Sequence, residues 1–300
     1  MSSPNLKSCF TAIDRFLMEP GDLRILNVIR PLFGIALAIN MLCVWPDRHF
    51  FFGSEGLITE DLYPLYSNVS WKLTTFLPRD VVGVNLYFLS LFAALGSLIV
   101  GIYPRVSALI VFILVTGLQN TNNLIWDGED TMFRLFALFF VFAPGPREVR
   151  PERQPDGSLK HPYPVWPLRL FQMQICLMFF ACGIEKMKGE PWVDGTAMYY
   201  VFRLHDFYKL PLPQLITENL TVMKLMTWGV LVLEVLAPVL IWFRETRRAT
   251  LALLLVFHLG IELTMNLMMF HWVMIAGWLS FATYEDLSML FSWFRKQPAS

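Results

Sequence analysis

Long apolar stretches alternate with short polar ones along almost the whole chain. Several stretches approach the roughly 20 residues that a helix needs to cross a hydrocarbon core. The fourth is short for a crossing, and the last two are joined almost without a break. The sequence therefore predicts an all-α, polytopic integral membrane helical bundle of about eight transmembrane helices. These helices are expected at residues 24–45, 83–102, 106–124, 131–144, 166–187, 221–243, 249–270 and 271–290.

The segments around these helices define the expected domain organisation. Before the Pro20-Gly21 break, residues 1–22 have the pattern of an amphipathic helix lying on the membrane surface. Lys7, Asp14 and Arg15 interrupt the apolar core that a cleavable signal peptide would need. The remaining division is a transmembrane domain at 23–290, with outer loops at 46–82 and 188–220 and an inner loop at 145–165, and a tail at 291–300.

Basic residues predict the orientation of these helices. With the N-terminus in the cytoplasm, fourteen of the 24 Lys and Arg residues fall in inner segments and eight in outer segments. An excess of Lys and Arg on the cytoplasmic side is the usual rule for membrane proteins. Both termini and the tail are therefore expected in the cytoplasm. The protein is expected to be a multi-pass protein of the plasma (inner) membrane if its source is bacterial.

Composition narrows the possible functions further. Hydrophobic residues make up 55% of the chain, the net charge is zero and there are ten Trp. The lipid bilayer is thus an expected partner, aromatic belts are expected at its surfaces, and nucleic acid is not an expected partner. No C-x-x-C pattern joins the cysteines, so we expect buried thiols and no metal site. The cysteines are Cys9, Cys43, Cys176 and Cys182.

Polar residues inside a span are costly and are therefore functional candidates. His258, Glu262 and Asn266 recur every four residues, which would place them on one face of a helix. Such a stripe could line a cavity or a proton path, or His258 could simply bond to a neighbouring helix in the core. Arg30 and Glu234 lie at similar depths with opposite charges, and we expect them to form a structural ion pair.

A second polar cluster follows the third span, in the stretch TNNLIWDGED. Asn122 and Asn123 could mark the exit of the helix into water, or could orient a polar ligand. Asp130 and the acids before it suit the first turn of the next helix, which favours negative charge. Arg134 follows Asp130 by one turn and could pair with it.

Lys186 closes the helix in the stretch FFACGIEKMKGEPWVDG. One interpretation is an anchor whose ammonium reaches the membrane surface, which we expect of Lys188. The other is a base, because burial disfavours the charged form of a lysine. The second interpretation requires Glu185 to point away from Lys186, toward the Trp192 loop or Arg203.

The motifs NNLIWDGED, FQMQICLMFFACGIEKMKGEPWVDG and FHLGIELTMNLMMFHWVM together resemble the HTTM (horizontally transferred transmembrane) family, as do Arg30 and Gly34. The resemblance covers about residues 20–285. The vitamin K-dependent gamma-carboxylase belongs to this family. The resemblance implies that Lys186 is the base that deprotonates reduced vitamin K or another quinol, with O2 and CO2 as co-reactants. It also implies a role for His258.

The chain departs from the gamma-carboxylase at two places. The sequence ends at Ser300, without the large lumenal domain, and Asn122 and Asn123 stand where the carboxylase has a histidine. A partner protein is therefore expected to replace that domain. We expect carboxylation or oxidation of a peptide at the outer face; the alternatives are a non-catalytic maturation factor for a secreted peptide or toxin, or a transporter. The expected site comprises the catalytic residues Lys186 and His258 and the quinol-binding residues Asn122, Asn123, Glu262, Asn266 and Trp192.

Overall fold

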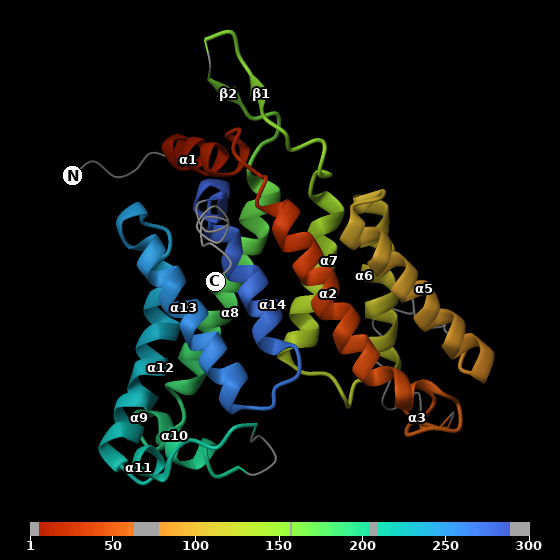
Figure 1. Cartoon of the computed structure of the whole chain (residues 1–300), viewed down its shortest axis with the longest axis vertical. Helices are drawn as coiled ribbons and strands as arrows, with labels where there is room; N and C mark the ends of the chain where they lie inside the picture. Colours follow the sequence, from red (N-terminus) through yellow and green to blue (C-terminus); the bar gives the residue numbers. More distant parts are fainter. Residues whose placement is uncertain (1–5, 60, 63–77, 157, 205–208, 289–300) are drawn as a thin grey trace, which may run out of the picture. The chain divides into compact units, whose positions relative to one another are not determined.

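The computed structural model describes residues 6–59, 61–62, 78–156, 158–204 and 209–288, and it confirms a mostly helical chain (Figure 1). The helices form two compact units, Met1–Arg169 and Leu170–Ser300. The predicted tail at 291–300 lies outside the described residues, as do residues 63–77 of the predicted outer loop.

Four long helices build the first unit. In this unit α6 packs against α5 and α7, and α2 packs against α5 and α7. The ring of Phe33 on α2 meets the rings of Phe133, Phe136 and Phe140 on α7, at centroid distances of 5.2 to 6.4 Å. The bounds are Leu26–Val44 for α2, Val81–Val100 for α5, Pro104–Thr121 for α6 and Gly128–Phe142 for α7.

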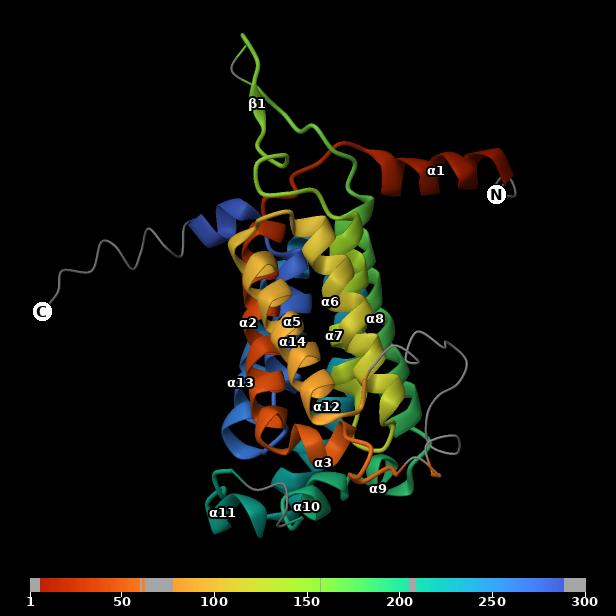
Figure 2. The same cartoon turned by 90° about the vertical axis from the view of Figure 1, so that its right-hand side faces the viewer.

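Short elements lie at both ends of these helices. Figures 1 and 2 show α1 (Leu6–Met18) and the hairpin of β1 (Glu152–Arg153) and β2 (Leu159–Lys160) at one end of α2. The 3-10 helix η1 (Trp45–Asp47) and α3 (Arg48–Phe52) follow the other end.

The N-terminal segment is paired with the loop that follows α7. Pro20 forms an isolated antiparallel bridge with Pro164. Gly21 N donates to Tyr163 O at 3.1 Å, and Val165 N donates to Glu19 O at 3.0 Å. This pairing places residues 19–21 and 163–165 on the same side of the first unit.

The second unit is built around α12. The short helices α9, α10 and α11 pack against α12, and Figure 1 shows them gathered at one end of it. Helix α13 packs against α12 and α14. The bounds are Trp166–Lys186 for α8, which begins in the first unit, Glu190–Val193 for α9, Ala197–Val201 for α10, Gln214–Thr217 for α11, Leu220–Leu240 for α12, Arg244–Thr264 for α13, Phe270–Trp278 for α14 and Leu279–Phe281 for η4.

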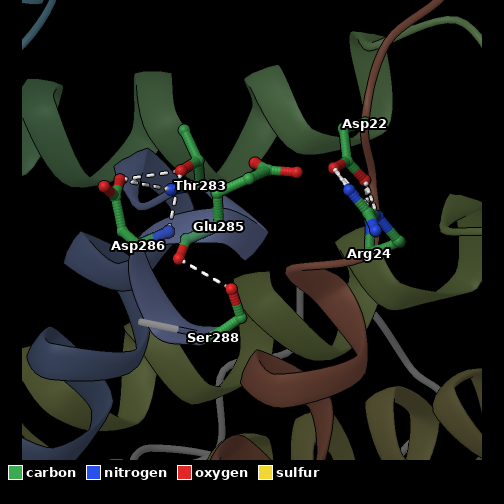
Figure 3. Close-up of polar contacts among 6 residues, drawn as sticks. All are labelled: Asp22, Arg24, Thr283, Glu285, Asp286 and Ser288. Carbon is green, nitrogen blue, oxygen red and sulfur yellow. Dashed lines mark hydrogen bonds and ion pairs between the residues drawn. The ribbon is translucent and has the colours of Figure 1, made fainter. Parts of the chain in front are cut away.

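Figure 3 shows polar side-chain contacts next to helices in both units. Asp22 holds the guanidinium of Arg24 just before α2. Before the last described helical turn, Thr283 and Asp286 bond reciprocally: Asp286 Oδ2 accepts from Thr283 N, and Thr283 Oγ1 accepts from Asp286 N. The contacts between Thr283 and Asp286 satisfy backbone donors that a helix start would otherwise leave open.

Within the described residues, five helices are long and apolar enough to cross a membrane. The chain is thus a multi-pass integral membrane protein. Three predicted spans differ: α7 has 15 residues, α13 begins with the charged stretch RETRR, and Phe270–Phe281 is a shorter apolar stretch. The count of eight and the cytoplasmic termini stay predictions. The five are Leu26–Phe52, Val81–Val100, Pro104–Thr121, Trp166–Lys186 and Leu220–Leu240.

Candidate active site

The second unit contains a cavity of about 300 Å³ with a mostly apolar wall. This volume lies at the lower end of the range for small-molecule sites. Four polar side chains with strong hydrogen-bonding groups border it: Lys186, Glu234, His258 and His271. The other lining residues are Met178, Phe179, Cys182, Trp192, Met198, Val201, Val230, Phe257, Ile261, Met265, Leu267 and Phe270.

A glycine brings two walls of the cavity close together. A Cβ on Gly183 of α8 would lie 2.9 Å from Val235 Cγ2 and 3.3 Å from Glu234 Cβ, both on α12. Only glycine therefore allows this approach without movement of α12. One turn later on α8, Lys186 Nζ lies 2.5 Å from Glu234 Oε1. The sequence separates these two residues by 48 positions, and the close helix contact unites them.

Trp192 covers the ammonium of Lys186 from another side. The Lys186 Nζ atom lies 5.2 Å from the centroid of the Trp192 ring, a distance at which a ring face attracts a cation. The helix that carries this tryptophan is tied to α12, because Trp228 Nε1 donates to Val193 O at 3.2 Å. Lys186 is thus held between a carboxylate and an aromatic ring at the cavity wall.

Two histidines form a separate polar pair in the same wall. His258 on α13 and His271 on α14 are completely buried, and their Nδ1 atoms lie 3.2 Å apart. The Nε2 atom of each is buried and has no hydrogen-bond partner among the described residues. Phe179 of α8 packs its ring against His258, with centroids 5.5 Å apart.

The structure therefore brings together three predicted site residues: Lys186, His258 and Trp192. Glu262 and Asn266 do not line this cavity. Glu262 forms an ion pair with Lys209 at 2.5 Å. Asn266 is exposed and follows the last helical residue, Thr264, so the predicted polar stripe ends with the helix.

Lys186 and Lys188 differ in their exposure and in their carboxylate partners. Lys188 is exposed and pairs with Glu185 at 2.5 Å, so Glu185 points away from Lys186. Glu185 does not pair with Arg203, which instead forms an ion pair with Glu218. Lys186, in contrast, has 27% of its side chain exposed and its own carboxylate partner. This partner, Glu234, was not anticipated by the sequence analysis.

The expected ion pair between Arg30 and Glu234 stays a prediction, because the two residues belong to different units. The Glu234 carboxylate is bound by Lys186. The Arg30 guanidinium is buried in the first unit, where Nη2 donates to Pro144 O at 2.7 Å and Cζ lies 5.6 Å from the Phe140 ring centroid. Each member thus has a partner in its own unit.

Asn122 and Asn123 belong to the first unit, and their expected contribution to the Lys186 cavity stays a prediction. Asn122 is completely buried, and its amide is occupied by the backbone: Nδ2 donates to Phe51 O and Oδ1 accepts from Leu124 N, both at 3.0 Å. This arrangement favours a structural role for Asn122. Asn123 is exposed.

The acids after the third span cap α7 as predicted. Asp127 Oδ1 accepts from Glu129 N, and Asp130 Oδ2 accepts from Asp127 N, which is a capping box. Oxygen atoms of Asp127, Glu129 and Asp130 lie within 4.8 Å of one another, and the capping geometry accounts for this. Asp130 also accepts from Asn40 Nδ2 at 3.3 Å. Among the described residues, the Asp130 carboxylate therefore bonds to Asn40 and to the Asp127 backbone, and not to Arg134 as predicted.

Comparisons with known proteins agree with the membrane character of the chain. A family profile described as the HTTM domain matches residues 18–285. A protein of Bacillus subtilis (strain 168), described as uncharacterized protein YitO, is 21% identical over 223 residues, which cover 71% of this chain and 72% of the Bacillus protein. No solved structure matches the chain.

Proposed function

Since the chain belongs to the HTTM family, we propose that it is a membrane-embedded enzyme resembling the vitamin K-dependent gamma-carboxylase, with Lys186 as a base toward a quinol. The observation that carries this proposal is the position of Lys186. Its ammonium borders an apolar cavity, 2.5 Å from Glu234 Oε1 and over the Trp192 ring. Lys188 also pairs with a carboxylate, that of Glu185, but it is exposed and does not border the cavity.

The cavity suits the ring of a quinol. Its wall is formed mainly by Met, Phe, Val, Ile and Leu side chains, with polar groups at few points. A flat apolar ring with hydroxyl groups can bury its faces against such a wall and direct its oxygens to those points. Trp192 and Phe179 would hold the ring, and Lys186 would lie beside one oxygen. When bound, a quinol supplies an acidic hydroxyl and the electrons for reaction with O2.

Glu234 explains how a paired lysine can act as a base. A lysine accepts a proton only as the neutral amine. Transfer of one proton from Lys186 Nζ to Glu234 Oε1, which lie 2.5 Å apart, gives an amine and a carboxylic acid. No net charge is created, so an apolar cavity does not oppose this transfer as it would oppose an isolated charge. Lys186 can then take up a proton from the ligand hydroxyl.

We also propose the topology of eight crossings with both termini in the cytoplasm. The pairing of Pro20 with Pro164 supports it, because an even number of crossings must separate two segments on the same side. Between them lie α2, α5 and α6, which are long enough to span, and the shorter α7. The proposal therefore counts α7 as a crossing. The plasma membrane, a peptide substrate at the outer face and a partner protein belong to the same proposal.

The test compares Lys186→Met with Lys188→Met in protein purified into lipid nanodiscs. Reduced 2,3-dimethyl-1,4-naphthoquinone and O2 are added, and quinol oxidation is followed by absorbance; incorporation of ¹⁴CO2 into protein is followed in intact membranes. Lys186→Met is expected to lower the quinol oxidation rate by at least 100-fold, as loss of a general base typically does. Lys188→Met is expected to keep the wild-type rate.

Folded yield separates catalysis from stability in this comparison. Met retains the apolar stem of the lysine, so both variants are expected to elute as folded protein on gel filtration. Full quinol oxidation by Lys186→Met would refute the catalytic role. Loss of folded yield in both variants, with unchanged specific activity, would show that Lys186 is an anchor. Absence of quinol oxidation in the wild-type protein would support the non-catalytic maturation factor. The Lys186–Glu234 ion pair is the observation that favours this alternative, because it also holds α8 against α12.

A further inference from the structure

We propose that α1 inserts its apolar face into the surface of the lipid bilayer, at the membrane boundary where α2 and α8 begin. The partner is the lipid surface itself, and it is contacted through hydrophobic side chains and not through charge. This inference goes beyond the proposed function, because α1 belongs to the first unit and the candidate site lies in the second.

One face of α1 is apolar and is left open by the rest of the protein. Phe10, Ile13 and Leu17 recur at spacings of three and four residues, which places them on one side of the helix. Phe10 is 68% exposed and Ile13 is 56% exposed. Among the α1 side chains that the structure describes, Leu17 is half-buried and the others are exposed. Contiguous exposed apolar surface marks a site of contact with a protein or a membrane.

The position of α1 in the first unit identifies the membrane as this partner. Residues 19–21, which follow α1, pair with residues 163–165, and Trp166 then begins α8. Helix α8 and helix α2, which begins at Leu26, are two of the candidate membrane spans. The end of α1 therefore lies where two spans meet the bilayer surface. Tryptophan residues such as Trp166 are typical of this level.

The orientation of α1 suits a helix that lies along the membrane surface. Figure 2 shows α1 extending sideways from the end of the first unit, across the direction of α2. At its last turn, Arg169 of α8 holds Phe16: Cζ lies 4.4 Å from the ring centroid, and Nε donates to Phe16 O at 3.3 Å. Phe16 follows Ile13 by three residues and borders the apolar face. Because α8 enters the membrane at Arg169, this contact turns the apolar face toward the bilayer.

Charge contributes little to this contact. The sequence of α1 contains two basic residues and one acidic residue, Lys7, Arg15 and Asp14. Arg15 and Thr11 lie four residues apart, on the side of the helix opposite Ile13. An amphipathic helix with so small a net charge binds a bilayer through its buried apolar area. We therefore expect α1 to insert into zwitterionic and anionic bilayers alike.

The test measures the environment of spin labels on α1 in the full chain. The four native cysteines are replaced by alanine, and a nitroxide is attached at Ile13→Cys or at Thr11→Cys. The protein is placed in phosphatidylcholine nanodiscs, and gel filtration checks that it is folded. Electron paramagnetic resonance then compares collisions of the label with O2, which concentrates in hydrocarbon, and with nickel(II) ethylenediaminediacetate, which stays in water.

The ratio of O2 to nickel accessibility is expected to be about tenfold higher at residue 13 than at residue 11, because such helices bury their apolar face by about 5–10 Å. Replacing part of the phosphatidylcholine by phosphatidylglycerol should change the ratio at residue 13 less than about twofold. Phe10→Asp should lower that ratio to the level of residue 11, since a charge on the apolar face opposes insertion. Thr11→Asp, on the polar face, is the matched control and should leave it unchanged.

The outcomes separate the lipid surface from other partners. High nickel accessibility at both labels would overturn the inference, because α1 would then lie in water. Low accessibility of residue 13 to both reagents would overturn it in favour of a second copy or another protein. Insertion only with phosphatidylglycerol present would overturn the apolar mode of contact. A high ratio at residue 13 alone, kept in phosphatidylcholine and lost in Phe10→Asp, supports the inference. None of these results depends on quinol oxidation, so the proposed function is tested separately.

Discussion

Gly183→Ala tests whether the close approach of α8 and α12 creates the candidate site. The added Cβ would lie 2.9 Å from Val235 Cγ2, about 0.6 Å inside the shortest optimal separation of two carbon atoms. Overpacking of this kind costs about 1–3 kcal/mol, against a gain of about 0.5–1 kcal/mol from replacing glycine in a helix. We expect a net loss of about 1–2 kcal/mol. Because Glu234 must shift, quinol oxidation should also fall.

The matched control is Gly229→Ala on α12, where an added Cβ would meet no atom within 4 Å. This variant should be unchanged or more stable by about 0.5–1 kcal/mol. Both are compared with wild type by thermal unfolding in detergent, with intrinsic tryptophan fluorescence as the signal, and by the rate of quinol oxidation. If Gly183→Ala matched Gly229→Ala in both assays, the helices would not be in contact at Gly183 and the argument for the site would fail.

Three further predictions concern single interactions. Lys186→Met and Glu234→Leu should each lower the unfolding temperature, but the double variant should lose about 1–3 kcal/mol less than their sum; additive losses would exclude the ion pair. A hydrogen bond from Tyr163 lowers the pKa of Glu148 below 4.5, so stability from this contact is present above pH 4.5 and is lost as the pH falls through the lowered pKa. Glu148→Gln should lack that acid-dependent loss when melting temperatures are measured at a series of pH values. If the melting temperatures of variant and wild type fell in parallel as the pH was lowered, the prediction would be contradicted. Asp286→Ala should cost about 1 kcal/mol by removing a helix cap; an unchanged melting temperature would disprove the cap.

The sequence predicted the helical membrane class because apolar runs near 20 residues are typical of helices that cross a bilayer. It also predicted that acids cap α7, since the first turn of a helix favours negative charge; the capping box itself came from the structure. Lys186 and His258 were proposed as site residues because ionisable groups in apolar helices are conspicuous, and both line one cavity. These successes share one property: the signal is contained within a single helix or its first turn.

Pairs between helices were harder to predict from the sequence. Depth along the membrane suggested Arg30 as the partner of Glu234, but depth does not say which helix faces which. The actual partner, Lys186, becomes evident only through the close contact at Gly183. His271 was overlooked because it follows the end of α13 by a short connection and shares no helical face with His258. The position of this histidine in the apolar stretch FHWVM could have identified it as a candidate site residue.

The pairing of Glu19–Gly21 with Tyr163–Val165 has a consequence for biosynthesis. The two segments are about 144 residues apart, so at 5–20 residues per second the second emerges roughly 7–30 s after the first. During that interval α2, α5, α6 and α7 are synthesised while the N-terminal segment still lacks its backbone partners. The insertion machinery must therefore insert these four helices before the pairing can form. The pairing then forms only after residues 163–165 have reached the side of the membrane where residues 19–21 lie.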